Sequence, residues 1–202
     1  MYKLSILILT HNRPLLFKRC VESILKHKKN FVEILVNNDT DDIEESSDYK
    51  LFHKKSDNLS DLYEFLFDSA SGEYIYFLED DDYITDDFFE NIDFLSDLYY
   101  MNFVSHDIRL TLERRKNKFD LEKINDKFQL SQILFKKKFV TEFPFGNNLD
   151  NDWVLFNNIL TNINQNNGII RVIEKYMWVQ TTDGKDNISF PKYNKDKRWI
   201  NG

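Results

Sequence analysis

Four consecutive acidic residues are the feature of this sequence with the clearest chemical potential. Glu79, Asp80, Asp81 and Asp82 directly follow residues 74–78, which favour a buried β-strand. Adjacent carboxylates repel one another and raise each other's pKa unless a cation compensates their charge. Hard oxygen ligands favour Mg²⁺ or Mn²⁺ over zinc. The sequence therefore predicts a divalent cation at the end of a strand.

A second interpretation of the same acids needs no cation. They can form a surface turn ahead of a helix, because Asp86 and Asp87 would then lie at the helix N-terminus, where the helix dipole stabilises negative charge. Taken alone, the acidic stretch leaves both interpretations open.

Two earlier segments also predict strands that end in polar residues. Residues 3–9 are an almost continuous apolar run followed by THNRP, and residues 32–36 are followed by NNDTDD. Between them, Pro14 suits the first turn of a helix that continues to about residue 27, with a cap from Thr10 or Asn12. This is a βαβ unit. In open α/β sheets ligands bind beyond the carboxyl ends of the strands, where the polar loops and the acids must lie.

Weaker signals predict the remaining elements. Residues 51–52 suit a third strand, Ser60 a helix cap, and Thr85 the cap of a helix with apolar positions 88, 92, 95 and 99. Further on we expect strands at 103–106 and 109–112, a basic turn at 114–118, a helix starting near Asp150 or Asn151, and strands at 169–173 and 176–179.

Composition limits the class of protein. A chain of 202 residues with 18 Phe, 10 Tyr and only 5 Gly and 3 Pro predicts one compact domain rather than disorder. The apolar run at 4–9 is too short to span a membrane and lacks a basic leader, so we expect no transmembrane segment and a cytoplasmic location. The single cysteine, Cys20, lies on an apolar helical stripe and is expected to pack in the core.

Charge is distributed unevenly along the chain. Residues 101–202 contain 17 Lys and Arg against 12 Asp and Glu, whereas residues 1–100 contain 10 against 22. Two interpretations of these basic clusters are open. They form ordinary solvated surface, or they bind an anion such as a polyanionic acceptor or a phosphate leaving group.

Four segments in order carry a resemblance to a known family. LSILILTHNRPLLFKRCVESIL, EILVNNDTDD, SGEYIYFLEDDDYI and LDNDWVLF together resemble the inverting family 2 glycosyltransferases of GT-A fold, over roughly residues 3–190. The resemblance implies a single-domain α/β protein, Rossmann-like, with a mostly parallel central sheet flanked by helices. We assign residues 1–190 to this domain and 191–202 to a basic C-terminal tail.

The resemblance implies a metal site at the acidic stretch. In the family an Asp-x-Asp motif holds Mn²⁺ or Mg²⁺ against the diphosphate of a nucleotide sugar. The matching residues are Glu79, Asp80 and Asp81, with Asp81 as the metal ligand and Glu79 in place of the first aspartate. The frame Asp80-Asp81-Asp82 is an alternative, and Asp81 belongs to both.

The resemblance also implies a donor site on the first two polar loops. Thr10, Asn12 and Arg13, together with Asn37-Asn38-Asp39 after the second strand, would contact the base and ribose, with a UDP-sugar as the default donor. Many relatives carry a metal- or phosphate-binding histidine near the C-terminus. The matching residues 180–189 contain none, and Thr181, Thr182, Asp183 and Lys185 are the candidates to replace it.

The catalytic base implied by the resemblance is Asp152, in the sequence Asn151-Asp152-Trp153. A carboxylate is needed there because the attacking acceptor hydroxyl must lose its proton. A purely structural alternative is a carboxylate stabilised at a helix N-terminus.

These motifs predict a metal-dependent transferase that moves a sugar to an acceptor hydroxyl of a saccharide, a glycolipid or another polymer. The alternatives are a non-catalytic nucleotide-sugar-binding module, because Glu79 and the missing histidine depart from the family, and an acceptor that is a hydroxymethylated base in phage DNA. A nucleotidyltransferase is disfavoured, since THNRP lacks the Gly and Lys of a phosphate loop.

Overall fold

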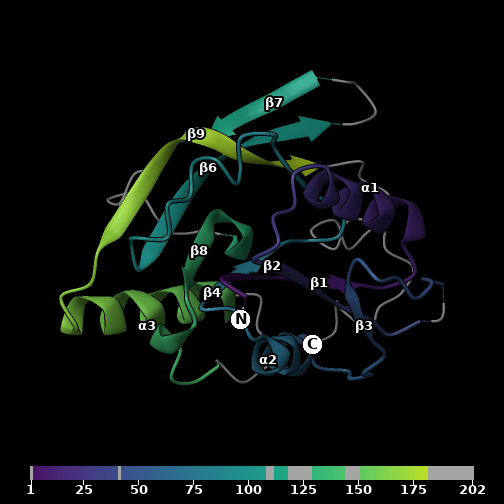
Figure 1. The fold of residues 1–202 in the computed structure, drawn as a ribbon, viewed down its shortest axis with the longest axis horizontal. Coiled ribbons are helices and arrows are strands. Elements are labelled where there is room, and N and C mark those ends of the chain that lie inside the picture. The colour runs from purple at the N-terminus through teal and green to yellow at the C-terminus, as the bar shows by residue number, and fades with distance from the viewer. Residues whose placement is uncertain (1, 41, 108–111, 118–128, 144–150, 182–202) are drawn as a thin grey trace.

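The computed structural model describes residues 2–40, 42–107, 112–117, 129–143 and 151–181. Within these residues a curled sheet forms the middle layer, and helices cover both of its faces (Figure 1). The strand order is β3-β2-β1-β4-β8-β6-β9-β5, with β7 paired to β6. The predicted α/β fold class is confirmed.

The first part of the sheet is parallel and has β1 at its centre. Strand β1 (Leu4–Thr10) pairs with β2 (Val32–Asn38) on one side and β4 (Tyr74–Phe77) on the other, and β3 (Lys50–Phe52) pairs with β2. Nearly all the side chains of β1, β2 and β4 are buried, as expected for strands covered on both faces. These strands confirm the predictions made from the apolar runs.

The second part of the sheet is mixed. Strand β8 (Ile133–Lys136) joins it to the parallel part by antiparallel pairing with β4 and with β6 (Leu98–Asp107). Strand β9 (Ile170–Thr181) runs parallel to β6, while β5 (Tyr83–Ile84) and β7 (Leu112–Asn117) are short antiparallel neighbours.

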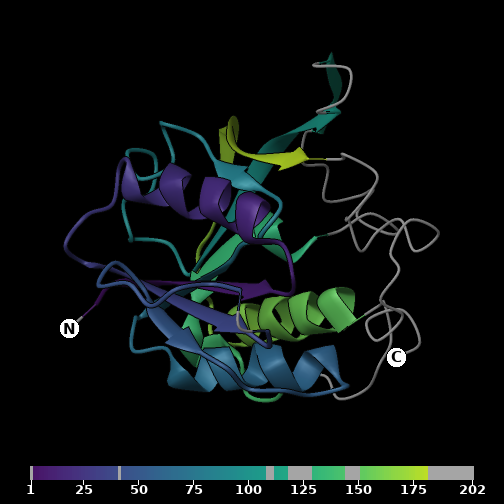
Figure 2. The same cartoon turned by 90° about the vertical axis from the view of Figure 1, so that its right-hand side faces the viewer.

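Helices pack on the two faces of the sheet and create two apolar clusters. Helix α1 (Pro14–Leu25) buries Phe17, Cys20, Val21 and Ile24 on one face, so the structural role predicted for the cysteine is confirmed. Helices α2 (Leu59–Ser69) and α3 (Asn151–Gln165) cover the other face (Figures 1 and 2). Short 3₁₀ helices, η2 (Leu130–Gln132) and η3 (Lys137–Phe139), flank β8.

Two predicted helix caps are wrong. The N-cap of α2 is Asn58, whose side chain accepts a hydrogen bond from the Ser60 backbone, so Ser60 lies inside the helix. The N-cap position of α1 is Arg13, and it makes no side-chain capping bond. Pro14 lowers the need for one, because it has no N–H at the first helical position.

The predicted helix after Thr85 is also wrong. Residues 85–97 form turns, and Tyr99 belongs to β6, where Leu134 of β8 and Arg171 of β9 pair with it. Phe94 adopts a left-handed conformation with φ 57, which a helix does not accommodate. Sheet pairing on both sides has therefore overridden the helical spacing of the apolar residues.

This correction removes the helix on which the second interpretation of the acidic stretch depended. Asp86 lies at no helix N-terminus and instead forms an ion pair with Lys26 at 2.8 Å and a hydrogen bond with His27 at 2.9 Å. The acids at 79–82 therefore lack the neighbouring helix dipole that the alternative required.

Two further predictions about the second half need correction. The two strands predicted at 169–173 and 176–179 are one strand, β9, which begins at Ile170 and whose register against β6 shifts on either side of Asn102. The Asn102 amide donates to the Glu174 carbonyl at this irregularity. Of the predicted basic turn at 114–118, residues 114–117 lie in β7. The predicted domain boundary at 190 and the basic tail lie outside the described residues.

In the described part of the chain, the helices are all too short or too polar to cross a membrane.

Gly72 marks the point at which the chain entering β4 crosses closest to β1. Its N–H donates to the Ser5 hydroxyl at 2.8 Å, and the Glu33 carboxylate accepts from Ser5, Ser71 and Gly72. A Cβ at position 72 would lie 2.5 Å from Ser5 Oγ, 2.7 Å from Ser5 N and 2.8 Å from the Leu4 carbonyl carbon. Two of these three atoms are backbone.

We therefore expect Gly72→Ala to destabilise the protein by about 1–3 kcal/mol, because the β1 backbone has no room to move in the middle of the sheet. Urea unfolding followed by circular dichroism measures this change. Adding Ser5→Ala should fail to restore stability, since the backbone contacts remain. An unchanged unfolding midpoint for Gly72→Ala would show that the close approach is not a constraint.

Candidate active site

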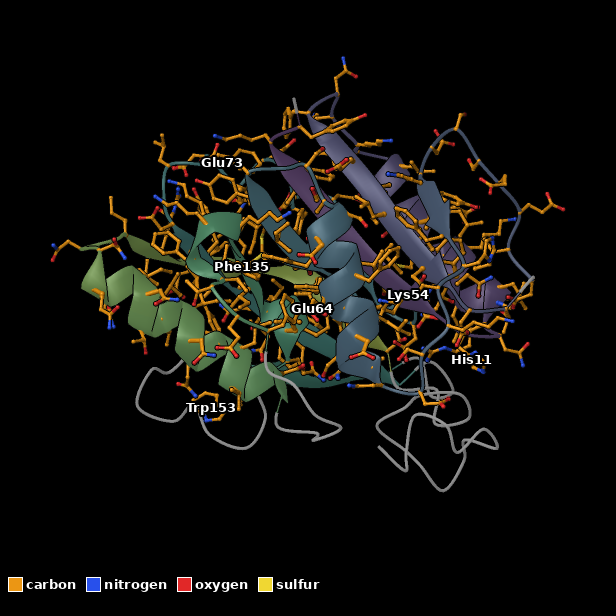
Figure 3. All side chains as sticks on the ribbon, turned by 90° about the horizontal axis from the view of Figure 1, so that it is seen from below. His11, Lys54, Glu64, Glu73, Phe135 and Trp153 are labelled. Carbon is orange, nitrogen blue, oxygen red and sulfur yellow. The ribbon has the colours of Figure 1, made fainter. Side chains whose placement is uncertain are left out.

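The carboxyl ends of β1, β2 and β4 meet at one edge of the sheet. Thr10 pairs with Asn38, and the Leu78 N–H donates to the Leu7 carbonyl just before the acidic residues. Figure 3 shows His11, which follows the carboxyl end of β1, toward one side of the protein. Glu73, which precedes the first residue of β4, lies toward the opposite side. The three polar loops thus converge, as the βαβ pattern predicted.

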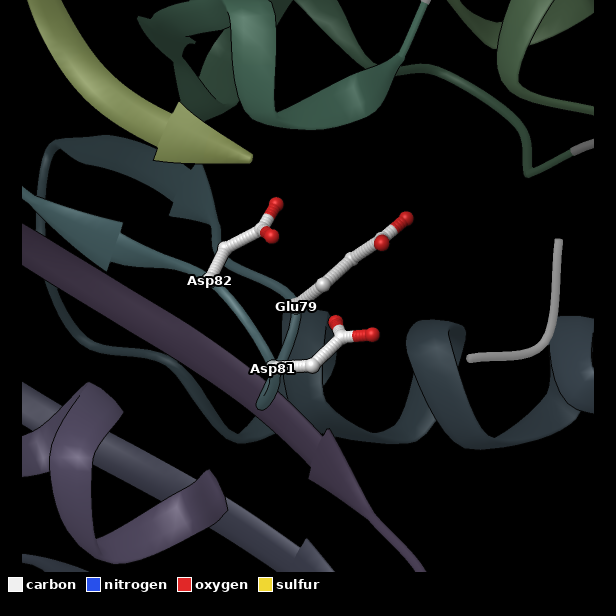
Figure 4. A group of neighbouring side chains, drawn as sticks. All are labelled: Glu79, Asp81 and Asp82. Carbon is white, nitrogen blue, oxygen red and sulfur yellow. The ribbon is translucent and has the colours of Figure 1, made fainter. Parts of the chain in front are cut away.

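The acidic loop at 79–82 brings three carboxylates together. One oxygen from each of Glu79, Asp81 and Asp82 lies within 4.8 Å of the other two, and Figure 4 shows the three side chains extending from one loop. The loop is a tight turn, in which the Asp82 N–H donates to the Glu79 carbonyl at 3.0 Å. Asp81 and Asp82 are buried, and Glu79 is partly buried. We call these three residues the carboxylate triad.

Asp80 is engaged differently from the triad. Its Oδ1 lies 2.5 Å from a guanidinium nitrogen of Arg13, and the other terminal nitrogen of Arg13 lies 3.6 Å from Asp81 Oδ2. Of the two predicted frames, Glu79-Asp80-Asp81 therefore places its first and third residues in the triad and its middle residue on Arg13. Asp82, from the alternative frame, completes the triad.

Burial disfavours negative charge on the carboxyl groups of this loop. Burial raises the pKa of Glu79 to about 8 and that of Asp80 to about 7, although Arg13 opposes both shifts. Burial, followed by the charge of Asp81, also raises the pKa of Asp82 well above its usual range. Among the described residues, the Arg13 guanidinium contacts the carboxylates of Asp80 and Asp81, and the Arg19 guanidinium contacts the Asp81 carbonyl.

The triad has the donor chemistry of a divalent cation site. Its ligand atoms are all carboxylate oxygens, which Mg²⁺ and Mn²⁺ prefer. Asp82 Oδ2 is buried and accepts no hydrogen bond from the described residues. A buried oxygen of this kind is costly unless something else satisfies it. The residues present therefore fit a divalent ion.

The side chains of Asn37 and Asn38 hold the donor loop together. The Asn37 amide makes two hydrogen bonds with the Lys54 backbone, at 3.0 and 2.9 Å. The Asn38 amide donates to Asp42 and accepts from the backbone and hydroxyl of Thr40. Both amides are thus committed to shaping the loop rather than projecting from it.

The other predicted donor residues surround this loop. His11 Nδ1 lies 2.5 Å from Asp39 Oδ1, which links the ends of β1 and β2. Thr10 is buried beside Asp80, whereas Asn12 is exposed in a left-handed conformation with φ 52.

Asp152 lies in the first turn of α3 and close enough to the acidic loop to interact with it electrostatically. Burial raises the pKa of Asp152 to about 6, and a hydrogen bond from the Leu130 backbone opposes that shift. The Asp152 charge in turn contributes to the raised pKa of Glu79. The neighbouring Trp153 packs against Phe156 with ring centroids 5.7 Å apart. Asp150 and its surroundings lie outside the described residues.

Three further residues belong to the site but were not predicted in these roles. Burial, followed by the charges of Glu79 and Asp152, raises the pKa of Tyr63 in α2. Arg19 and Thr181 make hydrogen bonds to the acidic loop. The sequence indicates Thr181 only as one of the candidates to replace the missing histidine. Its contact with Arg19 spans 162 residues, so no local sequence pattern could have indicated it.

Comparisons with known proteins agree with this geometry. The profile for "Glycosyl transferase family 2" matches residues 5–156. Among solved structures, the chain is similar to S. aureus TarS 1-349, with a TM-score of 0.69 and 16% identity over 90% of this chain and 61% of that chain. No curated protein matches the chain.

Two ligand complexes of TarS are also similar to the chain. For TarS 1-349 in complex with UDP the TM-score is 0.67 and the identity 17%, over 91% of this chain and 62% of that chain. For the complex with UDP-GlcNAc the TM-score is 0.65 and the identity 15%, over 89% and 58%. At these identities the likeness shows the fold, and the chain spans about three fifths of the length of these structures.

The raised pKa values predict how stability depends on pH without metal. Between about pH 5 and 8 the folded protein keeps protons on Glu79 and Asp80 that the unfolded chain has released, so the free energy of unfolding should fall as pH rises. Urea midpoints measured in the presence of a chelator test this expectation. Glu79→Gln should flatten the slope and the exposed Glu142→Gln should keep it. A midpoint that is constant or rises over this interval would contradict the prediction.

Proposed function

The chain belongs to glycosyltransferase family 2, and on that premise we propose that it transfers a sugar from a nucleoside diphosphate sugar to an acceptor hydroxyl, with inversion at the anomeric carbon. The observation that carries the proposal is the pairing of the carboxylate triad with a separate, partly buried carboxyl, Asp152, whose charge contributes to the raised pKa of Glu79. The first suits a diphosphate-bound cation and the second suits a base.

The donor in this proposal is a uridine diphosphate sugar. Support comes from the similarity in fold to TarS complexes with UDP and UDP-GlcNAc. In this chain, Thr10, Asn12, Arg13 and Asp39 are proposed to form the nucleotide-binding surface at the ends of β1 and β2. Asn37 and Asn38 shape that surface through their bonds within the loop.

The proposed cation is Mn²⁺ or Mg²⁺, held by Asp81 together with Glu79 and Asp82. When bound, such an ion neutralises negative charge on a diphosphate leaving group. Asp80 contributes indirectly, because it holds the Arg13 guanidinium beside Asp81, where a guanidinium would favour the binding of a phosphate.

Asp152 is proposed as the general base. The acceptor oxygen forms a bond to the anomeric carbon, the bond from that carbon to the diphosphate oxygen breaks, and the hydroxyl proton passes to the Asp152 carboxylate. A pKa of about 6 leaves Asp152 ionised at neutral pH yet more basic than an exposed aspartate. The acceptor is proposed to be a hydroxyl of a saccharide, a glycolipid or another polymer.

We expect UDP to raise the melting temperature of the protein only when Mn²⁺ or Mg²⁺ is present, because the metal links the triad to the diphosphate. At about 100 times Kd the ligand should add roughly 2.7 kcal/mol of stability. Asp81→Asn should abolish this shift, and Asp86→Asn, which changes an exposed aspartate, should retain it. The proposed donor site would be wrong if UDP shifted neither protein under any metal condition.

We expect Asp152→Asn to lower the transfer rate about 10²–10⁴-fold and to leave UDP binding intact, because it removes only the base. Product formation and UDP-dependent melting shifts, measured on the same preparation, separate the two effects. In the unchanged protein, kcat/KM at saturating Mn²⁺ should fall as pH drops through about 6, as Asp152 becomes protonated. Transfer at the normal rate by Asp152→Asn would exclude this residue as the base. Binding of UDP-sugar without any turnover in the unchanged protein would favour a binding module.

A further inference from the structure

Two residues hold the acidic loop from outside, and neither belongs to the triad. Arg19, from the middle of α1, donates from its Nη2 to the Asp81 carbonyl and to the Thr181 hydroxyl, the latter at 2.9 Å. Thr181 is the last residue of β9. Its hydroxyl donates to the same Asp81 carbonyl, and its N–H donates to Asp82 Oδ1 at 2.9 Å.

The hydrogen bonds from Thr181 to the acidic loop are buried, and those from Arg19 are partly buried. Thr181 and Asp82 are 2% and 1% exposed, so water competes little for their hydrogen bonds. The Arg19 guanidinium also lies over the ring of Tyr83, 5.4 Å from its centroid. Its neighbour Cys20 contacts the Glu79 carbonyl at 3.6 Å. Helix α1 thus contacts the acidic loop at two points, the Glu79 carbonyl through Cys20 and the Asp81 carbonyl through Arg19.

The bonds determine which carboxylate oxygen is left for a cation. Because Asp82 Oδ1 accepts the Thr181 N–H, the side chain cannot rotate freely, and its Oδ2 is the oxygen without a hydrogen-bond partner in the described structure. The Asp81 carbonyl accepts hydrogen bonds from both Arg19 and Thr181, and these two bonds fix the backbone from which the Asp81 side chain extends. The triad geometry is therefore set by α1 and β9 rather than by the loop alone.

We propose that Arg19 and Thr181 are positioning residues of the cation site, which hold Asp81 and Asp82 in the geometry that binds the metal. This inference rests on the metal-dependent function proposed above. In this proposal Arg19 has two opposing effects on cation binding. Its hydrogen bonds position the ligands, whereas its positive charge near the site should by itself weaken cation binding. Positioning and charge therefore predict opposite effects when Arg19 is replaced.

The test measures Mn²⁺ affinity by electron paramagnetic resonance, with and without saturating UDP, for Arg19→Gln and Arg19→Lys. If Arg19 positions the loop, both variants should bind Mn²⁺ about tenfold more weakly, since neither side chain can bridge the Asp81 carbonyl and Thr181 as a guanidinium does. If Arg19 acts only by its charge, Arg19→Gln should bind Mn²⁺ more tightly and Arg19→Lys should be unchanged, and the proposal would be overturned.

A second pair of variants examines Thr181 without altering charge. Thr181→Val keeps the shape and the backbone N–H to Asp82 but loses the hydroxyl, so Mn²⁺ affinity should fall several-fold. Thr181→Ser keeps a hydroxyl and should restore it. The control Lys18→Gln removes a positive charge from the exposed side of the same helix and should leave the affinity unchanged.

Melting temperatures of the metal-free proteins separate positioning from simple stabilisation. Lower melting temperatures with unchanged Mn²⁺ affinity in the Arg19 and Thr181 variants would overturn the proposal, because the contacts would then support only the fold. If the unchanged protein binds Mn²⁺ neither alone nor with UDP, the metal dependence of the proposed function fails, and this inference fails with it. Normal Mn²⁺ binding by every variant would refute the inference alone.

Discussion

The structure depends on a cluster of carboxyl groups whose burial opposes their ionisation. Three of the four acids at 79–82 are buried at the end of β4, and burial holds the pKa values of Glu79, Asp80 and Asp82 above their usual ranges. Such a loop is unfavourable in isolation, because desolvated like charges repel one another. The surrounding residues stabilise the loop. The Arg13 guanidinium contacts Asp80, the hydroxyl and N–H of Thr181 donate to Asp81 and Asp82, and the flanking strands hold the loop in place. An arrangement this costly is expected where charge is used for binding or chemistry.

The rest of the fold serves that loop by bringing distant segments to one sheet edge. Strand β1 lies between β2 and β4, so its polar end contributes Arg13 to the acids on one side and His11 to Asp39 on the other. Helix α1 covers one face and contacts the loop through Arg19, and α3 on the other face supplies Asp152. The residues proposed to bind the cation and the nucleotide thus come from the edge of the sheet, whereas the proposed base comes from a helix on one of its faces (Figures 1 and 4).

Much of the parallel part of this sheet could be predicted from the sequence, because β1, β2 and β4 are mostly apolar runs and each is followed by polar residues. The convergence of the three loops followed from the βαβ pattern alone. The segment after Thr85 could not be predicted, since the buried residues Phe88, Ile92 and Tyr99 have the spacing of a helix. The strands that pair with Tyr99 and override this spacing come from much later in the chain. The roles of Arg19, Thr181 and Asn37 were also beyond the sequence, because each depends on a partner that only the folded structure identifies. The residues of the base and metal sites remain proposals.

The irregular pairing of β9 with β6 has a consequence for how this protein can vary. The register shifts beside Asn102 lie before the part of β9 that reaches Thr181, and the Asn102 amide spans the irregularity by bonding to Glu174. An inserted or deleted residue at the irregularity changes only the size of a bulge. The same change beyond it would turn every later side chain of β9 to the opposite face and withdraw the Thr181 N–H from Asp82. Length variation among related sequences should therefore accumulate around residues 174–177 and be absent from 178–181.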